Sequence, residues 1–248
     1  MDLIDTHSHL SSIKNVNDVI YKAQSVGIKS IVAVGEDIVS SKATIVLGKK
    51  FNEYVYPAIG IHPSNSNENI LQTKEFIEKN LKLCLAVGEI GLDYWYKDAR
   101  KNESVRKRQR ELYVTQLEIA ESFNKPALVH SRGAWEEAFE IGRKYGPDNI
   151  VFHWYSGPLN VLEKILDSGF FISATPAAEY SKHLIGALRK APLEQILIET
   201  DSPVRFHGRD TEPSDILLTL KALAGLKNLP EKDVAKVTTI SASKFFQI

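Results

Sequence analysis

The chain has 248 residues, of which 43% are hydrophobic and 25% are charged, a composition that excludes wholesale disorder. Lysine and arginine together number 31, as do aspartate and glutamate, so the formal net charge is zero. A zero balance excludes a histone-like protein that coats duplex DNA through excess positive charge, but not an enzyme that takes one nucleic-acid end into a pocket.

Short apolar runs alternate along the chain with longer stretches of helical periodicity. The expected strands, in chain order, are 3–6, 30–34, 54–61, 83–89, 127–130, 150–153, 170–174 and 195–199. The expected helices are 17–26, 38–51, 68–80, 104–123, 135–145, 159–168, 181–190, 214–226 and 231–246. Nearly every strand precedes a helix, and continuously apolar strands are typical of a parallel sheet that is covered on both faces.

Eight strand–helix units within 248 residues predict a (β/α)8 TIM barrel that forms a single domain over residues 1–248. The alternative is an open, doubly wound sheet. No Gly-x-Gly-x-x-Gly follows the first strand, so the dinucleotide-binding form of that open sheet is not expected.

Six residues that can bind a metal stand near the C-terminal ends of predicted strands. His7 and His9 follow the first strand, and residues two apart on an extended chain point to the same face. In a barrel these strand ends meet at one mouth, where the active sites of this fold lie. The other four residues are Glu89, His130 and His153, which end strands four to six, and Asp201, which follows strand eight.

Each of these residues has a structural interpretation when it is taken alone, as a packed histidine, a helix cap or a turn residue. Their joint placement favours a metal site, and imidazole with carboxylate suits transition metals better than calcium. We expect two divalent metal ions (Zn, Mg or Mn) that activate water for a displacement. One ion is expected at His7, His9, Glu89 and Asp201, and the other at Glu89, His130 and His153, with the Glu89 carboxylate as the bridge.

Several segments, taken in order, resemble the TatD family of metal-dependent deoxyribonucleases within the amidohydrolase superfamily. They are Asp-Thr-His-Ser-His at 5–9, Gly-Ile-His-Pro at 60–63, Gly-Glu-Ile-Gly-Leu-Asp-Tyr at 88–94, His-Ser-Arg at 130–132, His-Trp-Tyr-Ser-Gly at 153–157 and Glu-Thr-Asp-Ser-Pro at 199–203. The resemblance spans nearly the whole chain. It implies a (β/α)8 barrel, the six metal ligands named above and a 3′–5′ exonuclease that acts on single-stranded DNA ends.

Four residues are candidates for catalysis or substrate binding. Glu89 and Asp201 are expected to be catalytic, and Asp201 is expected to accept a proton from the attacking water. His62, at the end of strand three, is expected either to contact the substrate phosphate or donate a proton to the leaving group, or else to be a packed histidine. Arg132 is expected either to bind a phosphate oxygen or to pair with an acid beneath the site.

Other residues near these motifs are candidates for supporting or substrate-binding roles. Glu199 and Asp5 suit supporting roles behind the metal ligands. The aromatic residues 94–96 would either stack bases or anchor a loop. The basic run 97–110 would either steer a phosphate backbone or form a solvated helix face, and we favour the solvated face.

Three positions depart from the common pattern of the family. Ser64 stands where a second histidine is common, Gly133 where an acid often follows His-Ser-Arg, and Ser241 where an asparagine is common. These departures keep open a second hypothesis, an amide, lactone or ester hydrolase on a small molecule, because function lies in the surroundings of a site. A third hypothesis is a metal-binding scaffold without catalysis.

The single cysteine, Cys84, excludes an internal disulfide and any Cys-x-x-Cys metal site. No stretch approaches the roughly 20 consecutive apolar residues of a membrane span. The N-terminus lacks the basic region and the apolar region that are typical of a signal peptide. We therefore expect a cytoplasmic protein with no membrane partner.

Overall fold

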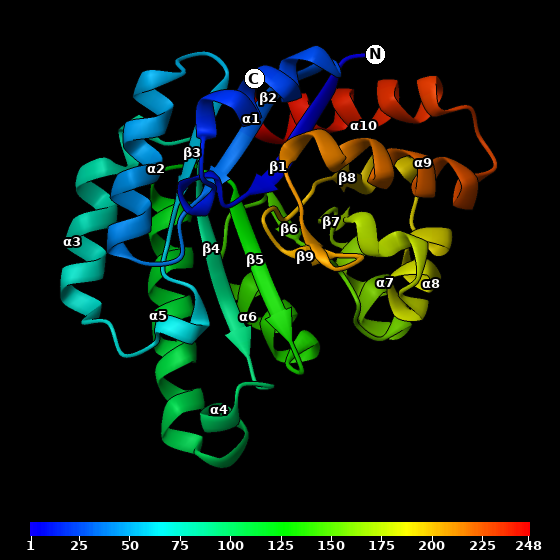
Figure 1. Cartoon of the computed structure of the whole chain (residues 1–248). Coiled ribbons are helices and arrows are strands. Elements are labelled where there is room, and N and C mark those ends of the chain that lie inside the picture. The colour runs from blue at the N-terminus through cyan, green and yellow to red at the C-terminus, as the bar shows by residue number, and fades with distance from the viewer.

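The computed structural model describes residues 1–248 and is built around eight parallel strands (Figure 1). Each strand is hydrogen-bonded to the next one in chain order, from β1 to β8. The strands are β1 (Leu3–Ser8), β2 (Ile28–Val34), β3 (Val55–Ile59), β4 (Ala86–Asp93), β5 (Ala127–Arg132), β6 (Ile150–Phe152), β7 (Phe171–Ala174) and β8 (Ile196–Ile198).

Strand β8 lies beside β1, so the ring of strands is nearly closed. The Thr6 hydroxyl donates a hydrogen bond to the Ile198 carbonyl oxygen at 3.0 Å. The chain after β8 continues along β1, where the Asp201 N–H donates to the carbonyl oxygen of His7 at 2.9 Å. The predicted (β/α)8 barrel is therefore confirmed, although His7 lies within β1 rather than after it.

Helices cover the outside of the ring. They are α1 (Val16–Ser25), α2 (Ile38–Lys50), α3 (Ile70–Asn80), α5 (Glu103–Ser122), α6 (Trp135–Tyr145), α7 (Leu159–Asp167), α8 (Lys182–Lys190) and α9 (Ile216–Lys227). The last helix, α10 (Glu231–Phe246), lies across the end of the barrel where the strands begin and contacts β1 and β8 (Figure 1). Its Phe245 and Phe246 join the inner side chains of the strands in one apolar cluster.

Strand alternation carries side chains from this inner cluster to the opposite end, the mouth of the barrel. On β5, Leu128 packs in the inner cluster, and His130 and Arg132 follow at intervals of two on the same face. On β6, Val151 faces inward and His153 comes two residues later. Strand β5 runs two residues beyond its predicted end, which brings Arg132 to the mouth as well.

The structure differs from the sequence prediction at two connections. The loop expected between the fourth strand and the long helix contains a short helix, α4 (Lys97–Lys101), which lies near the tips of β4 and β5 (Figure 1). A small hairpin of β9 (Arg205–Phe206) and β10 (Arg209–Asp210) follows β8. None of the helices combines the length and apolar character needed to cross a membrane.

Candidate metal centre

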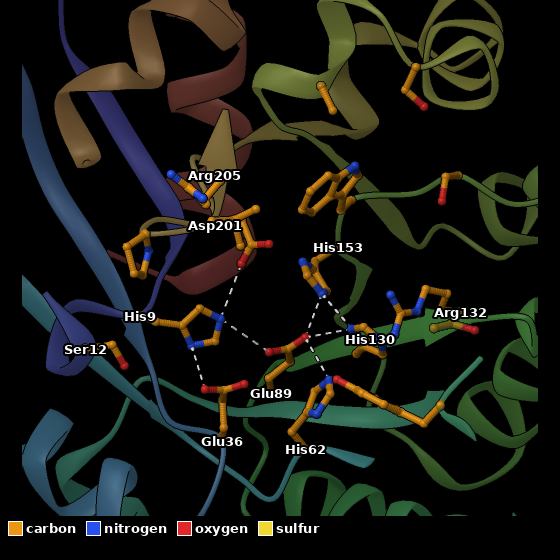
Figure 2. Close-up of a pocket in the computed structure, with 18 of the residues that line it drawn as sticks. His9, Ser12, Glu36, His62, Glu89, His130, Arg132, His153, Asp201 and Arg205 are labelled. Carbon is orange, nitrogen blue, oxygen red and sulfur yellow. Dashed lines mark hydrogen bonds and ion pairs between the residues drawn. The ribbon is translucent and has the colours of Figure 1, made fainter. Parts of the chain in front are cut away.

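The six predicted ligands come together at the mouth of the barrel (Figure 2). Five of them line a cavity of about 770 Å³, and His7 lies beneath them. Their side chains are buried almost completely, since the most exposed, that of His130, is 18% exposed. Figure 2 shows the Glu89 carboxylate between His9 on one side and His130 and His153 on the other.

Glu89 reaches the mouth because β4 is irregular at this point. Ala86 faces the inner cluster and Val87 the outer one, so strict alternation would turn Glu89 outward. The register of β4 on β5 shifts between Val87 and Ile90, and such an irregularity re-aims a side chain. The prediction that strand four ends at Glu89 is wrong, because β4 continues to Asp93.

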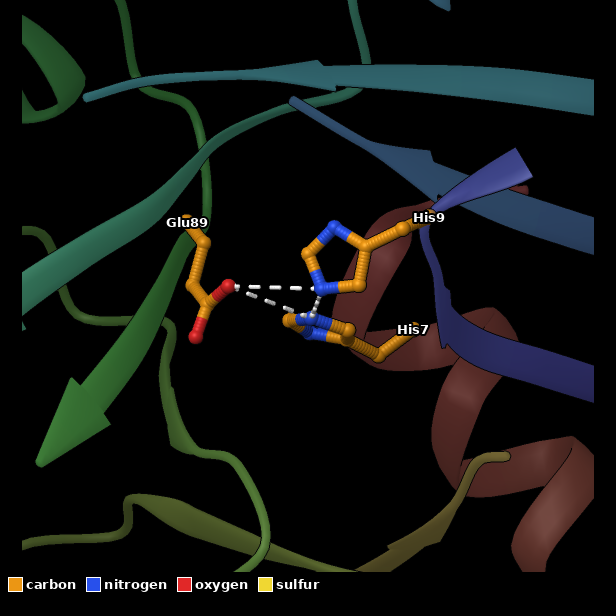
Figure 3. Close-up of side chains that lie close together, drawn as sticks. All are labelled: His7, His9 and Glu89. Carbon is orange, nitrogen blue, oxygen red and sulfur yellow. Dashed lines mark hydrogen bonds and ion pairs between the residues drawn. The ribbon is translucent and has the colours of Figure 1, made fainter. Parts of the chain in front are cut away.

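One half of the centre consists of His7, His9, Asp201 and the Oε2 oxygen of Glu89 (Figure 3 shows the two histidines and Glu89). The two histidine Nε2 atoms are 3.4 Å apart and lie 3.6 and 3.5 Å from Glu89 Oε2. Asp201 Oδ1 lies 3.6 and 3.3 Å from the same two nitrogens. Ligand atoms that surround a tetrahedral metal at about 2.0–2.2 Å are roughly 3.3–3.6 Å from one another. The observed separations match this spacing.

The other half gathers around the Oε1 oxygen of Glu89. This oxygen lies 2.7 Å from His153 Nε2 and 2.9 Å from His130 Nδ1. The two nitrogens are 3.3 Å apart. The two oxygens of Glu89 therefore face two separate pairs of histidines, as a bridging carboxylate would.

The charge of the centre favours a cation. Asp201 Oδ1 is buried and accepts no hydrogen bond. Burial lowers the pKa of His9, but the carboxylates of Asp201 and Glu89 raise it by more, to about 9. A divalent metal ion would neutralise the same negative charge, and it would bind the neutral form of each imidazole. The residues present thus fit a divalent metal.

Two carboxylates behind the centre orient His130 and His153. Asp93 Oδ2 lies 3.1 Å from His130 Nε2, and Glu199 Oε1 lies 3.2 Å from His153 Nδ1. Each contact leaves the other ring nitrogen directed at Glu89, the arrangement that fixes histidine ligands in metal sites. The sequence predicts a supporting role for Glu199 but none for Asp93. The one sequence feature that could have pointed to Asp93 is its position in the same motif as Glu89, at 88–94.

Asp5 acts on the backbone rather than on a histidine ring. Its carboxylate accepts hydrogen bonds from the Thr200 N–H at 3.0 Å and the Thr200 hydroxyl at 2.7 Å. Burial raises the pKa of Asp5 to about 8. Asp5 therefore ties β1, which carries His7, to the segment that carries Asp201.

Arg132 pairs with an acid beneath the site and also lines the cavity, where binding of a phosphate oxygen stays a prediction. Its Nε and Nη2 atoms each lie 2.8 Å from Asp93 Oδ2, and its side chain is 46% exposed. Burial raises the pKa of Asp93, but the bonds from His130 and Arg132 lower it by more. The buried Asp93 carboxylate thus holds a candidate metal ligand and a candidate phosphate-binding arginine at once.

His62 also lies at the mouth, 3.7 Å from Glu89 Oε1 through its Nε2 atom. Its Nδ1 atom accepts a hydrogen bond from the Ser64 N–H at 3.1 Å and lies 2.7 Å from the Ser64 hydroxyl. Because Nδ1 is an acceptor, the neutral ring carries its proton on Nε2. Burial lowers the pKa of His62 to about 3, so the ring is neutral.

Two charged residues of the cavity wall carry no prediction from the sequence. Glu36 stands two residues after the end of β2, and its Oε2 atom lies 3.9 Å from His9 Nδ1. Arg205 comes from the hairpin after β8, with its side chain 74% exposed. Glu36 stands near a strand end, as the six candidate ligands do, and could have been found by that signal, whereas Arg205 depends on a hairpin with no clear sequence pattern.

Comparison with known proteins gives consistent results. The family model for TatD-related DNases matches residues 4–247. The human deoxyribonuclease TATDN3 is 28% identical over 98% of this chain and 94% of its own length. An uncharacterised metal-dependent hydrolase of Methanocaldococcus jannaschii is 31% identical over 98% of this chain and 96% of its own length.

Comparison with solved structures also finds TatD homologues. The crystal structure of YjjV, a TatD homologue from Escherichia coli, superposes with a TM-score of 0.91 at 23% identity and covers 99% of this chain and 98% of its own. That likeness supports the barrel, and the match of the family model over 4–247 decides the membership. This chain belongs to the family of TatD-related DNases.

Proposed function

We propose that this protein is a hydrolase that uses two divalent metal ions to cleave phosphodiester bonds of DNA, from single-stranded ends in the 3′–5′ direction. The observation that carries the proposal is the placement of Glu89, whose two oxygens face two separate pairs of histidines. Membership of the family of TatD-related DNases supports DNA as the substrate.

The positions of the donor atoms support a proposed set of ligands for each ion. One ion would be held by His7, His9, Glu89 and Asp201, and the other by Glu89, His130 and His153. Mixed imidazole and carboxylate donors suit Zn or Mn, and Mg is the third candidate. When bound, such ions activate water and stabilise the charge that develops on the phosphodiester oxygens.

The residues around the ions would handle protons and the substrate. The Oδ2 oxygen of Asp201 would accept the proton that the attacking water loses. The Nε2–H of His62 would donate a hydrogen bond to the leaving oxygen, because Ser64 occupies Nδ1. The Nη1 group of Arg132 would bind a phosphate oxygen, since Asp93 engages Nε and Nη2.

The shape of the site supports cleavage at an unpaired strand end. The candidate ligands lie buried at the floor of the cavity of about 770 Å³. A nucleotide that is stacked and paired within a duplex cannot reach such a floor without being extruded. Arg132 and Arg205 on the wall favour an anionic phosphodiester over the neutral amide, lactone or ester of the alternative hypothesis.

Cleavage of an end-labelled single-stranded DNA oligonucleotide tests the proposal. Metal-stripped protein should be inactive, and Mg, Mn or Zn should restore cleavage. A ladder that shortens from the 3′ end would establish the direction. No cleavage with any metal, by protein that still binds two metals, would contradict the nuclease proposal and favour a carbonyl substrate, which a panel of small amides and lactones would identify.

Asp93→Asn tests the support behind His130. The amide keeps the size of the carboxylate but loses the charge that orients the imidazole, so we expect metal affinity to fall about 10- to 100-fold. Competition with a chromogenic chelator measures that affinity. Asp98→Asn on the exposed helix α4 is the matched control. Equal affinities in the two variants would contradict the role of Asp93.

A further inference from the structure

The connection from β4 to α4 places consecutive aromatic residues at the edge of the cavity. Tyr94 is an anchor, because its hydroxyl donates a hydrogen bond to Glu137 at 2.8 Å. Trp95 and Tyr96 are 57% and 40% exposed. Tyr96 lines the cavity, and Trp95 lies just outside it. The two exposed rings therefore continue the wall of the cavity outward, toward α4.

Arginine side chains hold these two rings in place. The Arg132 guanidinium lies 5.1 Å from the centre of the Tyr96 ring and 5.9 Å from that of Trp95. The Arg100 guanidinium lies 5.4 Å from the Trp95 ring. Arg132 is itself fixed by the buried Asp93. Each contact is within the range of cation–π attraction, so the rings and the charges are arranged before any ligand arrives.

Gly133 gives the Trp95 indole its position. A Cβ atom at residue 133 would lie 2.4 Å from Trp95 Cδ1 and 2.8 Å from Nε1, closer than packed atoms can approach. The φ angle of Gly133 is +72°, which also favours glycine. The departure from the family pattern at this residue is therefore what admits the indole to the edge of the cavity.

The four arginines of the basic run 97–110 divide into two groups. On α5, Arg106 and Arg108 donate hydrogen bonds to backbone carbonyls of neighbouring segments, and Arg110 pairs with two glutamates. These three side chains therefore hold the structure together. Arg100 on α4 instead lies at the exposed indole, beside the cavity.

We propose that Trp95, with Tyr96, Arg132 and Arg100, forms a platform on which an unpaired base stacks, next to the nucleotide that occupies the cavity. Exposed aromatic rings next to arginines suit a nucleic-acid strand, whose bases stack while its phosphates meet the cations. The continuity of the platform with the cavity through Tyr96 favours the substrate strand over a protein partner. The inference rests on the proposed nuclease function and adds that the substrate must offer an unpaired base beyond the scissile bond.

A scan of abasic positions in the substrate tests the platform. Short oligothymidylates carry one abasic residue at each of the first four positions from the cleaved end. Removal of the stacked base should lower kcat/KM of the wild type about five- to 150-fold at one position. Trp95→Ala should lower kcat/KM on the intact strand by the same factor and should be insensitive to the abasic residue at that position. Trp95→Phe should recover part of the loss.

The matched control is Tyr21→Ala, which removes an aromatic ring that is 76% exposed on α1 and does not line the cavity. It should cleave every substrate as the wild type does. Circular dichroism should show that both alanine variants are folded, since both side chains are exposed.

Two outcomes separate failure of the platform from failure of the proposed function. If wild type and Trp95→Ala cleave all strands equally, with the same abasic profile, the platform is wrong and the nuclease stands. If the wild type cleaves nothing, fluorescence anisotropy of a labelled oligothymidylate on metal-stripped protein still tests the platform. Weaker binding by Trp95→Ala, about five- to 150-fold, would support it, and equal binding would overturn it.

Discussion

Replacing Glu89 by alanine is expected to lower kcat/KM for single-stranded DNA by about 10³-fold or more while the barrel stays folded. The substitution removes both oxygens of the one side chain that faces both histidine pairs. Loss of metal-ion stabilisation of several kcal/mol in the transition state corresponds to this factor, at about 1.4 kcal/mol per tenfold change. Steady-state cleavage of the end-labelled oligonucleotide measures it, and elemental analysis of dialysed protein should show that bound metal falls with activity.

The control for this substitution is Glu118→Ala, which removes an exposed glutamate of α5, outside the cavity. It should keep the metal content and the activity of the wild type. Asp201→Asn provides a second view of the same centre, since it removes the charge of one ligand but leaves Glu89 in place. Wild-type activity in both Glu89→Ala and Asp201→Asn would refute the proposed site.

The barrel is predictable because its pattern is local and repeated. Strands such as β5 and β6 alternate strictly, so that Leu128 and Val151 in the core predict the inward direction of His130 and His153. Once the strands are parallel, their C-terminal ends share one mouth. Six candidate ligands that are far apart in the chain can therefore be grouped from the sequence alone.

Strand β4 shows where such reasoning fails. Strict alternation from Ala86 would turn Glu89 away from the mouth, and only the register shift against β5 brings it inward. The sequence contains the glutamate but no signal of the shift. The prediction placed Glu89 at the mouth by assuming that the strand ends there, whereas β4 continues to Asp93.

The contacts around the ligands depend on tertiary structure that a sequence pattern does not contain. Asp93 meets His130 and Arg132 only because β4 and β5 are paired and both extend beyond their predicted ends. Helix α4 is too short for helical periodicity to be visible. The position of Arg100 at the Trp95 ring depends on that helix, so it could not be predicted from the sequence either.

The three departures from the family pattern have different structural consequences. Ser64 holds the Nδ1 atom of His62, and Gly133 admits the Trp95 indole. Ser241 lies on α10 and donates a hydrogen bond to the Glu194 carbonyl oxygen at 2.8 Å. Since α10 covers the end of the barrel where the strands begin, Ser241 is a structural contact, and only Ser64 and Gly133 bear on the chemistry of the mouth.

Chelation of metal is expected to lower the Tm of the wild type by roughly 11–22 °C relative to protein in metal at about 100 times the Kd of each ion. Each ion that binds only the folded state stabilises it by about 2.7 kcal/mol at that concentration, so two ions contribute about 5.4 kcal/mol. For a domain of this size, each kcal/mol shifts Tm by about 2–4 °C. Here the effect has a clear cause, because Glu89 and Asp201 are buried together and need a cation. Differential scanning fluorimetry across a metal series measures it.

The same titration separates a metal centre from a purely structural cluster. Glu89→Ala should lose nearly all of the metal-dependent shift, because both ligand groups lose an oxygen donor, whereas Glu118→Ala should keep it. Calorimetric titration of metal-stripped wild type should give two ions per chain. If neither chelator nor added metal changes the Tm of the wild type, protonated histidines rather than metal ions neutralise Glu89 and Asp201. The raised pKa of His9 is consistent with that outcome. The site would then hold no metal ion to activate water, and the proposed hydrolysis would be refuted.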